Sequence, residues 1–296
     1  MSSPFVFPDY RAVYNFAPKY RSQHGKFALR VWLHRRQIRA FEAFANSNPA
    51  YRALFAKRPQ DAYPLLHAFI DKRFGARERL AAMQYDIAAA CRLFPADTLA
   101  KLDTPDTPVT LALLSDGLSI VLNRNGICSD EGLWAVTLTD GTGSRLYNAT
   151  FALLPAGLAA ASVQGPSGGE AKDTVRRLTK QLHGLRPQQL MAAVIQYLAA
   201  ALGLDALGIA HDCQVKLRWK LKKRVKMNYD QYWQESAAVL GGDGYWHLPA
   251  APPRKDLAEI ESKKRSMYRK RYQMFDDLEA AVNTHFRRPE HPAAAV

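Results

Sequence analysis

The sequence predicts an α+β protein in which a helical N-terminal region is followed by a mostly antiparallel sheet with flanking helices. Up to about residue 105, apolar residues recur at the spacing of an α-helix. A linker rich in Pro, Asp and Thr follows at Pro95–Pro108, and beyond it the apolar period changes to two. We therefore expect an N-terminal helical region at 1–105 and an α/β core with a long basic C-terminal helix at 106–296.

The N-terminal region should hold helices at Lys26–Ala45, Leu65–Phe74 and Ala76–Leu93. In the first, apolar residues follow one face, and Arg35, Arg36 and Arg39 fall on another. That basic face could bind phosphate, although a solvated helix face is the simpler explanation. Nothing in this region has the spacing of a catalytic site.

The core should begin with an antiparallel meander. Turns such as Ser115–Gly117 and Asp140–Gly143 contain glycine, which adopts the positive φ that hairpin turns need. Between them lie short runs rich in β-branched and aromatic residues. The strands are expected at Val109–Leu114, Leu118–Leu122, Leu133–Leu138 and Leu146–Leu153.

The stretch Ala161–His211 organises the rest of the chain. It reads as strand, glycine-rich turn, helix, break, helix and strand. Pro187 suits the first turn of the second helix, and Gly203 closes it. The elements expected are strand Leu158–Val163, turn Gln164–Gly169, a helix from Glu170, a helix at Gln188–Leu202 and a strand at Leu207–Ala210.

A strand, a glycine-rich turn and a helix N-terminus can form an anion-binding cradle, because free backbone N–H groups and the helix dipole point the same way. Gln164–Gly169 has this arrangement, but it is neither a Walker loop nor a GxGxxG motif. A plain strand-to-helix connection remains the alternative.

Two basic clusters follow. Val215–Leu221 alternates apolar and basic residues, which predicts a half-buried strand with a basic outer face. This strand is either an edge protected by lysines or an anion-binding rim. A long helix is expected at Asp256–Phe286, where basic residues alternate with aromatic ones that could stack a base or pack within the fold.

Composition narrows the class of partner. The chain has 296 residues, a formal net charge of +14 and a pI of about 9.7, which favours an anionic partner such as nucleic acid, an acidic membrane surface or a phosphorylated ligand. Three cysteines without a CxxC motif argue against a disulfide scaffold and a zinc site, so we expect no metal. No signal peptide or membrane span is evident, which predicts a cytoplasmic protein.

Several segments resemble the VirK/YbjX family of bacterial proteins. The most specific are Leu178–Pro187 (LTKQLHGLRP) and Ser262–Tyr272 (SKKRSMYRKRY). Further matches, in family order, are Glu78–Leu80 with Tyr85, Glu131–Leu133, Leu146–Phe151, Val163–Pro166, Tyr229–Asp230 with Trp233, and Asp243–Gly244. The resemblance implies a link to virulence and to resistance against antimicrobial peptides. Family members tend to end the strand before His211 in Ser-Asn, whereas this chain has Ala210-His211.

The order of elements is also similar to the core of GNAT acyltransferases, in which a turn after a strand holds the pyrophosphate of coenzyme A. That similarity implies a site for acyl-CoA or another acyl thioester, and fold-level analogy alone cannot establish activity. The donor-binding candidates are Gln164, Gly165, Ser167, Gly168, Gly169, Lys180 and Arg186. The candidates for proton transfer are His211, His183 and Glu131, although a histidine at the end of a helix or strand often makes only a capping hydrogen bond.

The alternative function is non-enzymatic binding of nucleic acid or anionic lipid head groups by the two basic clusters. Such binding should weaken steeply with salt. The candidate anion-binding residues are Lys216, Arg218, Lys220, Lys263, Arg265 and Arg269. No helix-turn-helix, zinc finger or RNP motif is present, so sequence-specific reading of bases is not expected. The oligomeric state is left open by the sequence.

Overall fold

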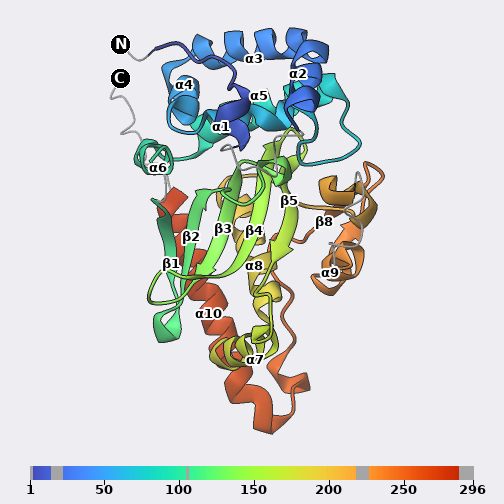
Figure 1. The fold of residues 1–296 in the computed structure, drawn as a ribbon. Coiled ribbons are helices and arrows are strands. Elements are labelled where there is room, and N and C mark those ends of the chain that lie inside the picture. The colour runs from blue at the N-terminus through green and yellow to red at the C-terminus, as the bar shows by residue number, and fades with distance from the viewer. Residues whose placement is uncertain (1–2, 15–22, 105–106, 218–226, 287–296) are drawn as a thin grey trace, which may run out of the picture.

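A computed structural model describes residues 3–14, 23–104, 107–217 and 227–286. Its centre is a sheet of eight strands in the order β1-β2-β3-β4-β5-β6-β8-β7 (Figure 1). The strands are β1 (Val109–Leu113), β2 (Ser119–Arg124), β3 (Trp134–Thr139), β4 (Arg145–Leu154), β5 (Gly157–Gln164), β6 (Ala206–Ile209), β7 (Val239–Leu240) and β8 (Tyr245–His247).

Strands β1 to β5 form an antiparallel meander, as the period-two pattern predicts. The chain then crosses over through α7 (Ala171–Gln181) and α8 (Pro187–Ala201), so that β6 pairs with β5 in parallel. Strand β8 returns antiparallel to β6. The α+β class and the strand–turn–helix–helix–strand order of the central stretch are therefore confirmed.

The N-terminal helices gather at one end of the sheet, at the top of Figure 1. They are α1 (Tyr10–Tyr14), α2 (His24–Leu33), α3 (Arg35–Ser47), α4 (Pro49–Ala56), α5 (Ala76–Leu93) and α6 (Ala96–Leu102). The single helix predicted at Lys26–Ala45 is two helices that meet at His34. The division of the chain near residue 105 stays a prediction.

The prediction of a helix at Leu65–Phe74 is wrong. A 3-10 helix, η2 (Pro59–Leu66), contains Pro64, and beyond it the backbone bonds to distant loops in place of its own turns. The Ile70 N–H donates to the Asp130 carbonyl at 2.7 Å, and the Lys72 N–H donates to the Cys213 carbonyl at 2.9 Å. This segment thereby joins two loops that border one face of the sheet.

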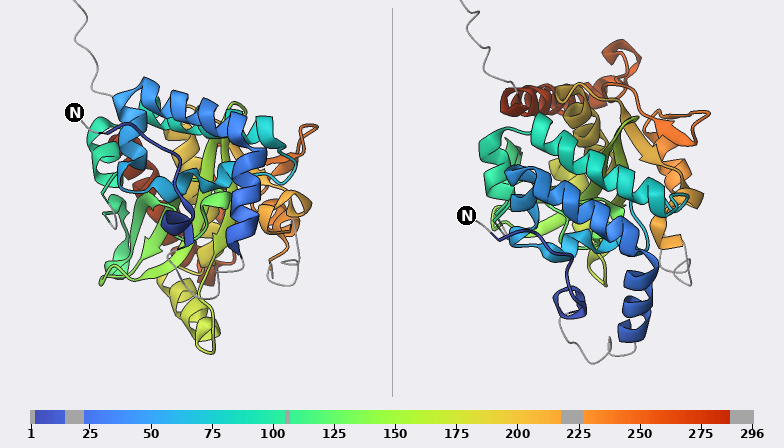
Figure 2. Two further views of the ribbon diagram at one scale, coloured as in Figure 1. Left: turned by 45° about the horizontal axis from the view of Figure 1, so that its top comes forward. Right: turned by 90° about the horizontal axis from the view of Figure 1, so that it is seen from above.

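Helices α8 and α10 (Ser262–Phe286) cover the opposite face, and Figure 2 shows α10 across the sheet from α1 and α2. Every residue from Leu190 to Ala199 of α8 is buried, because the sheet lies on one side of the helix and α10 on the other. On α10, the sequence pattern places Met267, Met274, Leu278 and Val282 on one apolar stripe; the last three are buried, whereas Met267 is half-buried. The helix starts at Ser262, six residues later than predicted, after the 3-10 turn η8 (Leu257–Glu259).

The strand predicted at Val215–Leu221 is also wrong over its described part. Residues 215–217 form a 3-10 turn, η6 (Val215–Leu217), which follows another at η5 (His211–Cys213). The Gln214 amide donates to the Ile209 carbonyl at 3.0 Å, which folds the chain back on β6 and ends strand geometry there. Residues 218–221 lie outside the described residues.

A buried carboxyl ties α5 to the sheet. Oδ1 of Asp86 accepts hydrogen bonds from the Leu153 N–H at 2.8 Å and from Trp134 Nε1 at 2.9 Å. Burial raises the pKa of Asp86 from 3.8 to about 7, against these two bonds. Its other oxygen has no hydrogen-bond partner among the described residues. The charged form is therefore costly inside the fold.

We expect Asp86→Asn to remove a pH-dependent loss of stability. Because the pKa in the fold, about 7, exceeds the unfolded value of 3.8, the stability that this group contributes is complete below about pH 4 and falls as the pH rises toward 7. Between about pH 5 and pH 8 the loss is on the order of 2–3 kcal/mol. Asparagine keeps an oxygen for both donors without the charge. Urea unfolding at both pH values should show a smaller difference for Asp86→Asn than for the wild type.

The control is Asp116→Asn, at an exposed turn residue. This variant should keep the wild-type difference between the two pH values. A difference in Asp86→Asn as large as that of the wild type would contradict the assignment of the effect to Asp86.

Candidate functional site

One face of the sheet carries a row of polar side chains. Thr137 on β3 pairs with Asn148 on β4, and Asn148 pairs with Gln164 on β5, so the three lie in register. Thr150 and Ser162 form the next pair, and their hydroxyls are 2.9 Å apart. All but Gln164 are buried, and buried polar groups of this kind need partners.

Glu131 lies over this row, in the loop between β2 and β3. The backbone can turn there because Gly132 adopts a φ of +104°, and a Cβ on Gly132 would lie 2.1 Å from the Phe151 carbonyl oxygen. One carboxylate oxygen of Glu131, Oε2, accepts bonds from Lys216 Nζ at 2.8 Å, Ser162 Oγ at 3.1 Å and Gln164 Nε2 at 3.1 Å. A predicted proton-transfer residue, a predicted donor-binding residue and a predicted anion-binding residue thus meet at one atom.

Burial raises the pKa of the Glu131 carboxyl, and the charge of Lys216 opposes that rise. The side chain of Glu131 is 2% exposed and that of Lys216 is 30% exposed, so solvent reaches the pair from the lysine side. Lys216 thus acts as an ion-pair partner inside the site, which differs from the outer anion-binding rim predicted for it.

Strands β5 and β6 separate at this point. Their pairing ends at Ala160 and Gly208, while β5 continues to Gln164. The opening is filled from α9 (Tyr229–Glu235), whose first turn is capped by the Asn228 side chain, a residue type favoured at N-caps. The Tyr229 hydroxyl accepts the Val163 N–H at 3.2 Å, and Trp233 Nε1 donates to the Ile209 carbonyl at 3.0 Å.

The Tyr229 hydroxyl completes what we call the polar cluster, which consists of Glu131, Thr150, Ser162, Gln164, Lys216 and Tyr229. Ser162 donates to Glu131, and the Tyr229 hydroxyl accepts the N–H of the next residue, Val163. Burial and the nearby Glu131 charge raise the pKa of the Tyr229 phenol, so it stays protonated at neutral pH. His211 packs on the Tyr229 ring with centroids 6.4 Å apart, at the edge of the cluster.

The glycine-rich turn begins where the cluster ends. Gly165 lies under Tyr147, whose ring atoms would be 2.6 Å from a Cβ, so the close approach requires glycine. Ser167, Gly168 and Gly169 are exposed, and Gly168 has a φ of +96°. The N-terminus of α7 has no side-chain cap. The turn therefore keeps the open backbone that an anion cradle needs.

The other predicted residues lie elsewhere. Helix α7 separates the turn from His183 by roughly 16 Å of helical rise. His183 and Lys180 meet Lys263 in a groove of about 650 Å³ between α7 and α10, which we call the basic groove. It is lined by Arg176, Thr179, Lys180, His183, Gly184, Lys263, Ser266, Met267 and Lys270. Four of these residues carry positive charge and none carries negative charge.

Three more candidates lie outside both sites. Arg186 is exposed before the first turn of α8, and Arg269 is exposed on α10. Arg265 donates to the Ile260 carbonyl at 2.8 Å, so it closes the turn before α10. Arg218 and Lys220 lie outside the described residues. No group of three or more His, Cys, Asp or Glu within the described ranges could hold a metal ion.

Sequence reasoning missed Thr150, Ser162 and the role of Tyr229. Two signals were available, because Asn148 and Thr150 alternate on one strand and Ser162 and Gln164 alternate on the next. Period-two polarity within otherwise apolar strands indicates a polar face. The contact of Tyr229 with β5 has no such signal, because 66 residues separate it from Val163.

Comparison with known proteins identifies the family. Residues 17–284 match the family described as "Protein of unknown function (DUF535)". The chain belongs to this family. It is 24% identical over 278 residues to the uncharacterized protein YbjX of Escherichia coli, covering 90% of this chain and 84% of YbjX, which confirms the VirK/YbjX resemblance.

Other relatives extend over similar lengths. An uncharacterized protein of Haemophilus influenzae is 32% identical over 280 residues, covering 93% of this chain and 96% of the relative. A Mannheimia haemolytica protein named "Membrane protein LapB" is 34% identical over 221 residues, covering 73% of this chain and 96% of the relative. No solved structure matches the chain. In the part of the chain that the structure describes, every helix is too short or too polar to cross a bilayer.

We expect Lys216→Met to destabilise the fold because it leaves the Glu131 carboxyl without its cationic partner. Removing one partner of a buried pair costs about 3–5 kcal/mol, and the partial exposure of Lys216 reduces this to about 1–2 kcal/mol. Adding Glu131→Gln should recover most of the loss, since glutamine keeps an acceptor for Ser162. The free energies of unfolding of the two single variants and the double variant measure the coupling.

Lys172→Met, at an exposed lysine of α7, is the matched control and should change stability by less than about 0.5 kcal/mol. Strict additivity of Lys216→Met and Glu131→Gln would mean that the pair does not interact.

Proposed function

We propose that the polar cluster is the catalytic centre of an acyltransferase that uses an acyl thioester such as acyl-CoA. The observation that carries this proposal is that a buried carboxyl, Glu131, bonds to Ser162 while a buried phenol, Tyr229, bonds to the next residue, Val163, where β5 and β6 separate. A proton acceptor and a proton donor in one cluster are what acyl transfer requires.

The proposed reaction balances with these groups. An amine or hydroxyl of the acceptor attacks the thioester carbonyl and gives its proton to Glu131. The carbon–sulfur bond breaks, and the leaving thiolate takes the proton of Tyr229. The proton on Glu131 then returns to Tyr229 through solvent, which reaches the cluster from the Lys216 side. The products are the acylated acceptor and a free thiol.

Two further features support an acyl thioester as donor. The order of the strands, with a parallel pair that opens beside a turn and a helix, is similar to that of GNAT acyltransferases. The exposed backbone of Gly168 and Gly169 and the N-terminus of α7 suit a pyrophosphate. Because Tyr229 already bonds to the Val163 N–H, the thioester lies beyond Val163, along Gln164 and Gly165.

We expect Tyr229→Phe to lower the turnover of acyl-CoA about a hundredfold while acyl-CoA still binds, because it removes the proton donor and leaves the turn intact. Release of free thiol from acetyl-CoA and longer acyl-CoAs measures turnover, and the rise in melting temperature measures binding. Tyr232→Phe is the matched control, since its hydroxyl bonds to the Gln188 carbonyl at 2.8 Å on the same helix, outside the cluster.

Binding is tested at the turn itself. Gly169 has open space at its Cβ, so Gly169→Glu adds a carboxylate without a collision, whereas any side chain at Gly165 would strike Tyr147. Stabilisation by acyl-CoA should vanish in Gly169→Glu and persist in Gly169→Ala. Absence of acyl-CoA binding to the wild type, or equal turnover in Tyr229→Phe and Tyr232→Phe, would refute the proposed function.

The basic groove favours a second function, contact with anionic lipid head groups. Arg176, Lys180, Lys263 and Lys270 line it without a carboxylate, and one relative is named a membrane protein. With this second function, the protein would act in the cytoplasm at a membrane surface. Such a location is compatible with the link to virulence and peptide resistance that the VirK/YbjX resemblance implies. The affinity of such a cationic groove for anionic lipid should fall strongly as the salt concentration rises.

We expect the double change Lys180→Glu and Lys263→Glu to reduce co-sedimentation with phosphatidylglycerol vesicles at least tenfold at low salt, because four charge units are reversed in one groove. The matched control makes the same charge change outside the groove, at the exposed lysines Lys172 and Lys101. Equal loss in both double variants would assign binding to net charge alone. Binding to a short DNA duplex but not to vesicles would show that the ligand of the groove is nucleic acid and not lipid.

A further inference from the structure

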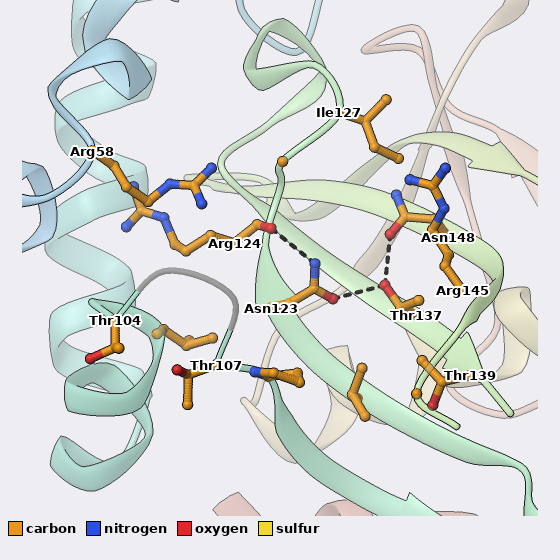
Figure 3. Close-up of a pocket in the computed structure, with 15 residues that line it drawn as sticks. Arg58, Thr104, Thr107, Asn123, Arg124, Ile127, Thr137, Thr139, Arg145 and Asn148 are labelled. Atoms are coloured by element: carbon orange, nitrogen blue, oxygen red, sulfur yellow. Dashed lines mark hydrogen bonds between the residues drawn. The ribbon is translucent and has the colours of Figure 1, made fainter. Parts of the chain in front are cut away.

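A second cavity lies on the polar face of the sheet, beside the polar cluster. It has a volume of about 380 Å³, within the usual range of small-molecule sites, and Figure 3 shows its walls. Asn148 lines it and is the cross-strand neighbour of Gln164 in the polar cluster. The cavity is therefore next to the proposed catalytic centre and separate from the glycine-rich turn and the basic groove.

The described lining of this cavity is cationic. Arg58, Arg124 and Arg145 contribute to it, and no carboxylate does. Arg58 and Arg124 are held by one buried aspartate, Asp61, at 3.0 Å and 2.6 Å. One carboxylate thus neutralises one of three guanidinium groups, which leaves a formal charge of about +2 around the cavity.

Two nitrogens of Arg124, one of the lining residues, lack a hydrogen-bond acceptor. The Arg124 side chain is 3% exposed and stacks over the Trp134 ring, with its guanidinium carbon 4.7 Å from the ring centroid, while its Nε and Nη1 have no hydrogen-bond partner among the described residues. A buried guanidinium nitrogen without an acceptor is costly, so an anionic ligand that supplied one would stabilise the site.

The hydrogen bonds of Asn148 show what else the ligand must offer. The Thr137 hydroxyl lies 2.8 Å from Asn123 Oδ1 and 2.7 Å from Asn148 Oδ1, but it has one hydrogen to donate. Asn123 is fixed, because its Nδ2 donates to the Arg124 carbonyl at 2.9 Å. The Asn148 side-chain amide must therefore be flipped, which exchanges its oxygen and nitrogen. Its Nδ2 then donates to Thr137, and its oxygen is the atom without a hydrogen-bond partner.

The cavity then combines cationic donors with a buried acceptor that has no partner. Asn148 is 2% exposed, so its free oxygen needs a donor from a ligand. Thr104, Thr107 and Thr139 add hydroxyl groups to the same wall. The charge of about +2 matches a phosphate monoester, which is close to a dianion at neutral pH, better than it matches a monocarboxylate.

We infer that this cavity is a binding site for a small phosphorylated sugar or polyol, whose phosphate meets the arginines and whose hydroxyl donates to Asn148. The inference does not depend on acyl transfer, since it concerns binding in the absence of any thioester. If the proposed function also holds, the adjacent position makes this ligand, free or as the head group of a lipid, the acceptor of the acyl group.

Isothermal titration with glucose 6-phosphate, glucose and inorganic phosphate tests the inference. We expect glucose 6-phosphate to bind at least tenfold more tightly than inorganic phosphate and glucose to bind not at all. Arg145→Gln, at an exposed position, should weaken glucose 6-phosphate about tenfold, and Asn148→Leu should weaken it without affecting inorganic phosphate. Arg177→Gln, at an exposed arginine of α7 outside the cavity, is the control and should bind as the wild type does.

No binding of glucose 6-phosphate, or equal binding by Arg145→Gln and the wild type, would overturn the inference. Equal affinity for glucose 6-phosphate and inorganic phosphate would overturn the inference that a sugar hydroxyl donates to Asn148. Should Asn148→Leu fail to fold, Arg145→Gln still decides the outcome. Tyr229→Phe should bind glucose 6-phosphate normally, so failure of the acyltransferase proposal and failure of this inference are distinguishable.

Discussion

The need of the Glu131 carboxylate for partners shapes the elements around it. A carboxylate that is 2% exposed is tolerated only with a cation and hydrogen-bond donors, and they come from separate parts of the chain: Ser162 and Gln164 from β5, and Lys216 from the turn after β6. The loop that carries Glu131 is held in turn by the Ile70 N–H on the Asp130 carbonyl. One buried charge thus links the N-terminal region, the meander and the crossover.

One face of the sheet contributes mainly to stability, and the other carries the polar side chains of the proposed site. Helix α8 is buried on all sides between the sheet and α10, and this apolar layer stabilises the fold. The other face accepts buried threonine, asparagine and serine side chains, which contribute little to stability on their own. The opening between β5 and β6 joins these layers, because Tyr229 and Trp233 fill it and reach the backbone of both strands.

The sequence predicts the elements whose periodicity is strong and local. The meander, the crossover helices and the Asn228 cap follow from alternation, glycine and capping residues. The two failures have different physical causes. Leu65–Phe74 has regular apolar spacing, but its backbone bonds to distant loops, whereas Val215–Leu217 forms a 3-10 turn in which the Leu217 N–H donates to the Gln214 carbonyl. Glu131, Gln164 and Lys216 could be selected singly, whereas their meeting at one oxygen depends on long-range packing that no local pattern encodes.

If a buried polar face serves only to specify a fold, all of its hydrogen bonds should be made. Around Glu131 the network is nearly closed, which suits a preorganised catalytic centre. At the neighbouring Asn148 it is open, since one atom of the Asn148 amide and two nitrogens of Arg124 have no hydrogen-bond partner within the described chain. These unpartnered groups border one cavity of about 380 Å³. Such incompleteness costs stability without improving specificity, so at this cavity it is better explained by a ligand that completes the hydrogen bonds than by the requirements of folding.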